Sequence, residues 1–141
     1  MKSPVVLCID DLPQVLALRK AALESRGYIV KLAVSGYAAM QVLEETPVAV
    51  VLLEYKQEGI HAEAIAGHIK QRFPSLPIIL LSAHAETPER ILWLVDEYVL
   101  KSELPQGLVS AVERATGMTA VQDGRRIPPH STGSARGVAV A

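Results

Sequence analysis

The chain has 141 residues and a formal net charge of −1, and half of its residues are hydrophobic although only 4% are aromatic. This length fits a single domain with an aliphatic core. No apolar run approaches the ~20 residues of a membrane-spanning helix, the N-terminus has no secretory signal pattern, and one cysteine excludes a disulfide framework. The charge balance does not indicate nucleic-acid binding. We expect a soluble, cytoplasmic protein that binds neither membrane nor nucleic acid.

Charge and composition divide the chain near residue 117. Residues 1–117 contain 11 Lys and Arg against 14 Asp and Glu, whereas residues 118–141 contain three Arg against one Asp. The second segment is rich in Gly, Pro and Ser and has no apolar periodicity, so it buries too little surface to offset the entropy of ordering. We predict a domain over residues 1–117 and a disordered C-terminal tail over residues 118–141.

Short apolar runs predict five strands, over residues 5–9, 29–34, 48–53, 78–81 and 98–100. Runs that are apolar at nearly every position are typical of strands covered on both faces, as in a parallel sheet. A segment with helical spacing follows each run, and strands that alternate with helices predict right-handed βαβ units. The expected fold class is α/β, with a doubly wound, five-stranded parallel sheet.

The predicted helices are placed by their apolar faces and boundary residues. The first begins near Pro13, ends before Gly27 and carries an apolar face of Val15, Leu18, Ala22 and Leu23. The second begins after Ser35 as N-cap, and the third ends at Pro74. The fourth is short, and the fifth takes Ser102 as its N-cap.

Polar side chains stand at the ends of the predicted strands. Asp10 and Asp11 follow the first strand, Glu54 the third, Ser82 the fourth and Lys101 the fifth. Carboxyl ends of parallel strands share one sheet edge, where α/β folds place their functional groups. Three carboxylates there repel one another unless a cation joins them, either a hard metal ion such as Mg²⁺, Lys101, or both. The hydroxyl of Ser82 and the ammonium of Lys101 could donate hydrogen bonds to a metal-bound phosphoryl group. The set therefore indicates a site that handles phosphoryl groups.

Each of these residues also has a plainer structural explanation. Asp10 and Asp11 precede Pro13, where an aspartate can cap a helix. Ser82 can form a turn, and Lys101 can be a solvated lysine. Their joint occurrence, in order, at the ends of four strands favours the functional interpretation.

At these positions the sequence resembles the receiver domain of bacterial response regulators, the CheY-like or flavodoxin-like fold, over residues 4–117. The run Val-Val-Leu-Cys-Ile-Asp-Asp resembles the family's first strand and acidic pair. Ser82 followed by Ala83 resembles the Ser/Thr-Ala that ends the fourth strand. Tyr98 stands three residues before Lys101, as the family's aromatic switch residue does.

The resemblance implies a site as well as a fold. The strand order would be 2-1-3-4-5. Asp10 and Asp11 would hold Mg²⁺, Ser82 would contact a phosphoryl group, and Tyr98 would report that group by changing rotamer.

Glu54 departs from the family, whose phosphoacceptor at this position is an aspartate. Glutamate adds one methylene, about 1.5 Å of reach, and a 1 Å misplacement can cost in-line transfer roughly a hundredfold in rate. We expect Glu54 to imitate a charged state in part, to reach toward Lys101, and not to accept phosphate efficiently. The backbone carbonyl of Lys56 is the expected further metal ligand, but its cationic side chain competes with a metal. We therefore expect weak Mg²⁺ binding or none.

Residues 91–95 are apolar at every position, and a short helix cannot bury all of its faces. Most of this segment is expected to be core. Trp93 is the candidate for an interface, because tryptophan is enriched among binding hot spots. The predicted partner contact is a protein, with a homodimer through the fourth helix, fifth strand and fifth helix as one form.

The leading hypothesis is a stand-alone receiver-type protein of two-component or phosphorelay signalling. It is not an enzyme, and it acts by contacts with a histidine kinase or a downstream target in trans, independently of phosphorylation. Two alternatives remain open. One is a receiver still phosphorylated at Glu54, Asp10 or Asp11, and the other is a metal-dependent phosphatase-like enzyme on the same fold.

Overall fold

The computed structural model describes residues 3–56, 61–83 and 87–117. Strands and helices alternate along these residues, which confirms the α/β prediction. The elements are β1 (Val5–Ile9), α1 (Pro13–Glu24), β2 (Ile29–Ala33), α2 (Gly36–Glu45), β3 (Val50–Tyr55), α3 (Ala62–Arg72), β4 (Ile78–Ser82), α4 (Glu89–Leu92), β5 (Glu97–Leu100), a short 3-10 helix (Lys101–Glu103) and α5 (Gln106–Thr116). The predicted tail lies outside the described residues.

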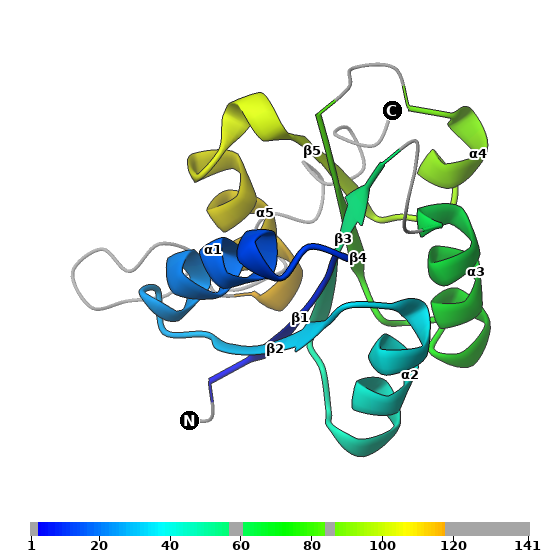
Figure 1. Ribbon diagram of the computed structural model, residues 1–141, viewed down its shortest axis with the longest axis horizontal. Helices are drawn as coiled ribbons and strands as arrows, with labels where there is room; N and C mark the ends of the chain where they lie inside the picture. The colour runs from blue at the N-terminus through cyan, green and yellow to red at the C-terminus, as the bar shows by residue number, and fades with distance from the viewer. Residues whose placement is uncertain (1–2, 57–60, 84–86, 118–141) are drawn as a thin grey trace.

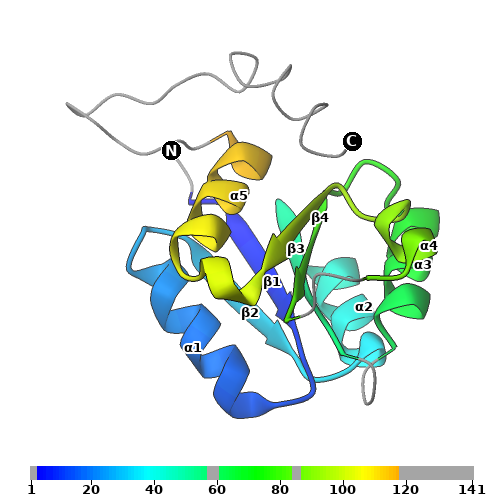
Figure 2. The same ribbon diagram turned by 90° about the horizontal axis from the view of Figure 1, so that it is seen from above.

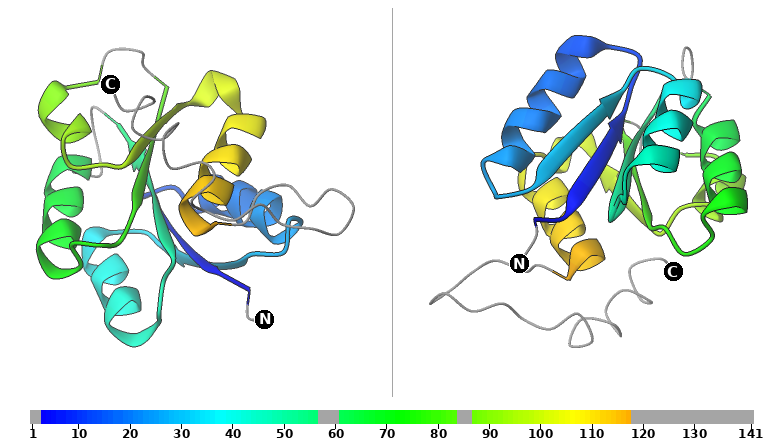
Figure 3. Two further views of the ribbon diagram at one scale, coloured as in Figure 1. Left: turned by 180° about the vertical axis from the view of Figure 1, so that it is seen from behind. Right: turned by 90° about the horizontal axis from the view of Figure 1, so that it is seen from below.

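The strands form one parallel sheet in the order β2-β1-β3-β4-β5, as the family resemblance implied. Helices cover both faces. Figures 1 and 2 show α1 and α5 on one face of the sheet and α2, α3 and α4 on the other. The reverse and lower views in Figure 3 give the same two layers around the sheet.

Two hydrophobic cores fill the space between the sheet and its helices. Alternate residues of each central strand enter opposite cores, because successive strand side chains point to opposite faces. Val50 and Leu52 of β3 join the α1/α5 core, whereas Val51 and Leu53 join the α2/α3/α4 core. The same alternation directs Glu54 toward the α1/α5 side.

The inward face of α1 differs from the predicted one. Leu16 and Leu23 are buried against the sheet, whereas Leu18, which the apolar spacing placed inside, is 65% exposed. Helical spacing is compatible with a buried face through Leu18 or with one through Leu16. The helix packs with the Leu16 face on the sheet, and Arg19 lies on that face. The helix stops as predicted before Gly27, whose positive φ of 93° suits a residue without a side chain.

The helix boundaries are partly those predicted. The Ser35 side chain caps α2 by accepting a hydrogen bond from the Ala38 backbone N–H at 3.1 Å, and α3 ends before Pro74. The prediction of Ser102 as the N-cap of α5 is wrong, because Ser102 lies in the 3-10 helix and Pro105 occupies the N-cap position. None of the helices in the described ranges has the length and apolarity needed for a bilayer crossing.

The α4 segment is a single turn, short as predicted. Ile91 and Val95 are buried in the α2/α3/α4 core, whereas Trp93 is 80% exposed. One turn cannot direct every apolar side chain inward. Trp93 is therefore a surface residue and not part of the core.

Candidate functional site

The sheet register brings the ends of β1 and β3 together. Ile9 pairs with Leu53, so the residues that follow these two in the chain, Asp10 and Glu54, lie at the same sheet edge. Both side chains are almost completely buried, with 0% and 1% exposure. Ser82, the last residue of β4, is also fully buried and pairs in register with Tyr55. Parallel strands thus deliver these polar groups to one edge, as predicted.

Lys56 bridges the two aspartates. Its ammonium Nζ lies 2.5 Å from Asp10 Oδ1 and 2.6 Å from Asp11 Oδ1. The second oxygen of Asp10, Oδ2, is buried and has no hydrogen-bond partner among the described residues. Asp11 differs, because its side chain is 38% exposed. A buried aspartate and a surface aspartate therefore share one lysine.

The surroundings move the pKa values of this trio in different directions. Burial raises the pKa of Asp10 above its usual range, against the opposing effect of its hydrogen bond with Lys56. The hydrogen bond from Lys56 lowers the pKa of Asp11. Burial works to lower the pKa of Lys56, but hydrogen bonds to both aspartates outweigh it and raise that pKa. The lysine is thus held in its charged form.

Glu54 belongs to a second ion cluster. Arg19 Nε donates a hydrogen bond to Glu54 Oε2 at 2.8 Å, and Lys101 Nζ lies 2.9 Å from Oε1. The side chains of Arg19 and Lys101 are 12% and 28% exposed. Each oxygen of the buried carboxylate therefore faces a cation, one from α1 and one from the start of the 3-10 helix.

Arg19 was not identified from the sequence. It lies three residues after Leu16 and four before Leu23, on the inward stripe of α1. An arginine on a buried stripe requires an anionic partner, and this spacing was the available signal. The predicted apolar face ran through Val15, Leu18 and Ala22 and did not include Arg19.

The three carboxylates divide between two sets of cations, and the expected contact between Glu54 and Lys101 is present. Lys56 holds Asp10 and Asp11, and Arg19 and Lys101 hold Glu54. Strand alternation is consistent with this division, because it directs Glu54 toward the α1/α5 side, where Arg19 lies.

As arranged, the pocket does not fit Mg²⁺. Mg²⁺ binds oxygen at about 2.0–2.1 Å and prefers octahedral coordination. One oxygen of each aspartate, Oδ1, already contacts the Lys56 ammonium, and Asp10 Oδ2 is the buried aspartate oxygen that Lys56 leaves unpaired. Glu54, the third carboxylate, has both of its oxygens on other cations. A divalent ion would have to displace Lys56 before it could bind both aspartates.

A further candidate is Tyr98, the predicted switch residue. Tyr98 is half-buried in β5, and its hydroxyl accepts a hydrogen bond from the Thr87 hydroxyl at 3.2 Å. Neither Asp10 nor Asp11 is the N-cap of α1, because Leu12 holds that position and makes no side-chain cap. The capping explanation for the acidic pair is therefore wrong.

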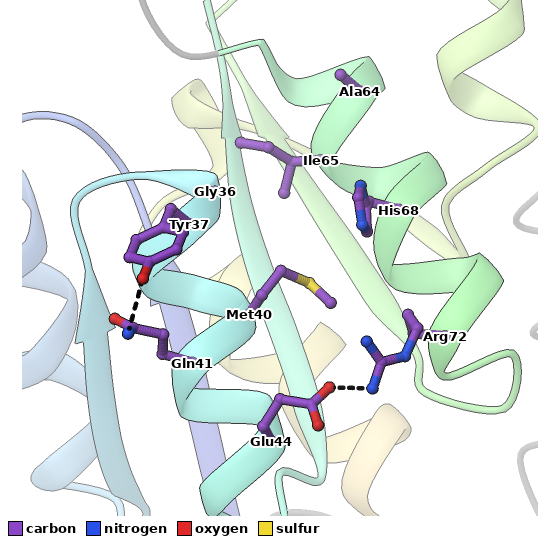
Figure 4. A pocket seen from close by; sticks show the side chains of 9 residues that line it. All are labelled: Gly36, Tyr37, Met40, Gln41, Glu44, Ala64, Ile65, His68 and Arg72. Atoms are coloured by element: carbon purple, nitrogen blue, oxygen red, sulfur yellow. Dashed lines mark hydrogen bonds and ion pairs between the residues drawn. The ribbon is translucent and has the colours of Figure 1, made fainter.

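A separate groove lies between α2 and α3 (Figure 4). It has a volume of about 470 Å³, with Met40 and Ile65 among its lining residues and Tyr37 at its edge. An ion pair between Glu44 and Arg72 crosses it. The groove contains none of the predicted site residues.

Comparison with known proteins identifies the domain. The family model of the response regulator receiver domain matches residues 6–113. The chain is 31% identical over 131 residues to the sensor histidine kinase GacS of Pseudomonas protegens, covering 87% of this chain but 14% of that protein. It is 30% identical over 122 residues to a putative NtrX-like response regulator of Rickettsia felis, covering 83% and 26%. The chain thus spans a small part of these relatives.

Solved structures agree with that assignment. The response regulator TrrA of Thermotoga maritima, solved in complex with Mg²⁺–BeF, matches with a TM-score of 0.73 and 30% identity, covering 82% of this chain and 99% of TrrA. A receiver domain protein of Clostridium thermocellum matches with a TM-score of 0.72 and 27% identity, covering 80% of this chain and 94% of that protein's chain. The α/β fold, the carboxyl-edge acidic pocket and the family match lead to one conclusion: the chain belongs to the response regulator receiver domain family.

Proposed function

We propose that this receiver domain signals through protein contacts and does not depend on phosphorylation at Glu54. The carrying observation is the position of the Glu54 carboxylate, which is 1% exposed with Arg19 on one oxygen and Lys101 on the other. A nucleophilic carboxylate needs an oxygen free to approach phosphorus in line. Here both oxygens are engaged by cations.

The contact between Lys101 and Glu54 supports a pocket whose charge does not depend on phosphorylation. In the family resemblance, this lysine stands beside the phosphoryl group. In this chain its ammonium pairs at 2.9 Å with the longer carboxylate of Glu54. The pocket thereby holds a carboxylate of its own opposite Lys101, which imitates in part the charged state that phosphorylation produces.

The proposed partner is another protein of two-component signalling, a histidine kinase or a downstream target. Relatives of this chain include a sensor histidine kinase and response regulators. The face formed by α4, β5 and α5 is the proposed contact surface, with Trp93 as its exposed anchor. Arg114 of α5 donates two hydrogen bonds to Glu97 of β5, at 2.8 and 2.7 Å, which joins two of the three elements of this face. A homodimer through the same face, in the cytoplasm, is part of the proposal.

Incubation with Mg²⁺ and a small-molecule phosphodonor, followed by intact mass measurement, tests the proposal. We expect no stable adduct of about 80 Da and no release of inorganic phosphate above the donor's own hydrolysis. TrrA treated in parallel serves as the receiver control. A stable adduct would support the alternative of a working phosphoacceptor, and catalytic phosphate release would support a phosphatase. Either result overturns the proposal.

A further inference from the structure

The acidic pocket contains its own counterions. Its three carboxylates and Lys101 have a formal net charge of −2, which one divalent cation would balance. Arg19 and Lys56 supply two further positive charges, each within 2.8 Å of a pocket carboxylate oxygen. We propose that Arg19 and Lys56 together take the place of the divalent cation, so that the pocket is electrically complete without a metal and Lys56 excludes Mg²⁺ from it.

Lys56 holds the position between the aspartates. Its Nζ is 2.5 Å from Asp10 Oδ1 and 2.6 Å from Asp11 Oδ1. A Mg²⁺ ion bound to the same two atoms at about 2.1 Å would share that gap with an ammonium of like charge. Coulomb repulsion at such separations is strong wherever water is largely excluded. Only one of the two cations can therefore occupy the site.

Arg19 neutralises the third carboxylate. Its side chain comes from the buried stripe of α1, where it is 12% exposed, and it reaches the 1%-exposed Glu54. A guanidinium does not lose its proton in proteins, so this charge is permanent. Because Arg19 and Lys101 each hold one oxygen, Glu54 offers no free oxygen to a metal at Asp10 and Asp11.

This inference extends the proposed function, and the two can fail separately. A pocket that bound Mg²⁺ could still lack a usable acceptor at Glu54, and the mass measurement would show no adduct. The test below therefore measures metal binding alone.

Calorimetric titration of Mg²⁺ at matched ionic strength tests the role of Lys56. The variant Lys56→Ala removes the ammonium, and Lys56→Arg is the control that keeps a cation. We expect no saturable binding to the natural protein or to Lys56→Arg. We expect saturable binding to Lys56→Ala, at least about tenfold tighter than any residual binding to the other two. The Lys56 side chain is 22% exposed, and circular dichroism checks that the fold is retained. If Lys56→Ala does not fold, Lys56→Gln replaces it with the same expectation.

Three results would overturn the inference. The natural protein could bind Mg²⁺ as tightly as Lys56→Ala, Lys56→Arg could bind as tightly as Lys56→Ala, or the folded Lys56→Ala variant could fail to bind. Each would show that the Lys56 ammonium does not exclude the metal.

Thermal unfolding tests the role of Arg19. We expect Mg²⁺ to raise the unfolding temperature of Arg19→Gln/Lys56→Ala more than that of Lys56→Ala, because the double variant has lost both resident charges. Arg90→Gln/Lys56→Ala is the matched control, since Arg90 pairs with Glu63 on the surface and is 77% exposed. An equal shift in both double variants would remove Arg19 from the proposal.

Discussion

Arg19 and Glu54 are 35 residues apart in the chain, yet the Arg19 Nε donates a hydrogen bond to Glu54 Oε2 at 2.8 Å. This contact joins the middle of α1 to the end of the central strand β3. It involves Glu54, the residue that replaces the aspartate of the pattern that the sequence resembles. An extra methylene at position 54 brings the carboxylate within reach of α1, and an inward arginine receives it.

Removing that arginine should destabilise the fold. Arg19→Met leaves the buried Glu54 carboxylate with Lys101 alone, and breaking a buried ion pair costs about 3 kcal/mol. Urea unfolding with an unchanged m-value measures the loss. Arg72→Met is the control, because its pair with Glu44 is about half exposed and should contribute less than about 1 kcal/mol. Equal costs for the two variants would contradict a buried, structurally important Arg19–Glu54 pair.

Shortening the acidic side chain should begin to restore phosphoryl acceptance. Glu54→Asp withdraws the carboxylate by about 1.5 Å, away from its simultaneous contacts with Arg19 and Lys101. We expect little modification in Glu54→Asp, because Lys56 still blocks the aspartates, and clear modification in Glu54→Asp/Lys56→Ala. Intact mass after incubation with Mg²⁺ and a phosphodonor reports both variants. A folded double variant that remains unmodified would place the block elsewhere, in the loop after β3.

Trp93 should matter for association and not for folding. Because its side chain is 80% exposed, we expect Trp93→Ala to change the free energy of unfolding by less than about 0.5 kcal/mol. The same change should weaken self-association or a partner complex by about tenfold or more, as measured by analytical ultracentrifugation.

Tyr37→Ala provides the matched control for Trp93. Tyr37 is 77% exposed on α2, beside the groove between α2 and α3. We expect it to leave both stability and association unchanged. A Trp93→Ala variant that loses stability but associates normally would contradict the interface role.

Cys8 should make the fold sensitive to alkali. Burial, together with the nearby Glu54 charge, raises the pKa of this thiol from 9.0 to about 12. Between these pH values the unfolded chain ionises the thiol and the folded chain does not. The free energy of unfolding should therefore fall as pH rises, by up to about 1.4 kcal/mol per pH unit from this group.

Comparison with Cys8→Ala isolates that contribution. The free energy of unfolding of Cys8→Ala should decline less steeply above pH 9 than that of the natural protein. A loss of stability at neutral pH from the small cavity left by the thiol does not affect this comparison. Alkylation of the natural protein at pH 8 should also be slow until denaturant exposes the thiol. Rapid labelling of the folded protein would contradict a buried, protonated Cys8.

The sequence by itself determined the layered fold. Short continuous apolar runs are typical of strands covered on both faces, and the helical segments between them supply that cover. Boundary residues such as Ser35, Gly27 and Pro74 act through local backbone chemistry, so their effects were predictable. The position of Ser102 was not predictable in this way, because the chain forms a 3-10 helix there before α5 begins.

The acidic edge was also predictable in kind. Asp10 and Asp11 follow β1, and Glu54 lies near the end of β3. The carboxyl ends of these parallel strands meet, and the need for cations beside the carboxylates follows from electrostatics. Lys101 was a candidate for that reason, whereas Lys56 was named as a backbone metal ligand whose cationic side chain competes with a metal. The sequence did not predict which cation pairs with which carboxylate, because ion pairing depends on side-chain positions a few ångströms apart.

Only the tertiary structure decided the role of Arg19. Two stripes of α1 satisfy helical periodicity, and the choice between Leu18 and Leu16 as the buried residue depends on how the helix packs on the sheet. That rotation carries Arg19 inward, to a strand more than thirty residues away. Periodicity is a property of local sequence, whereas the partner of a buried charge is set by long-range packing, and that difference separates what the chain alone determined from what its folded form added.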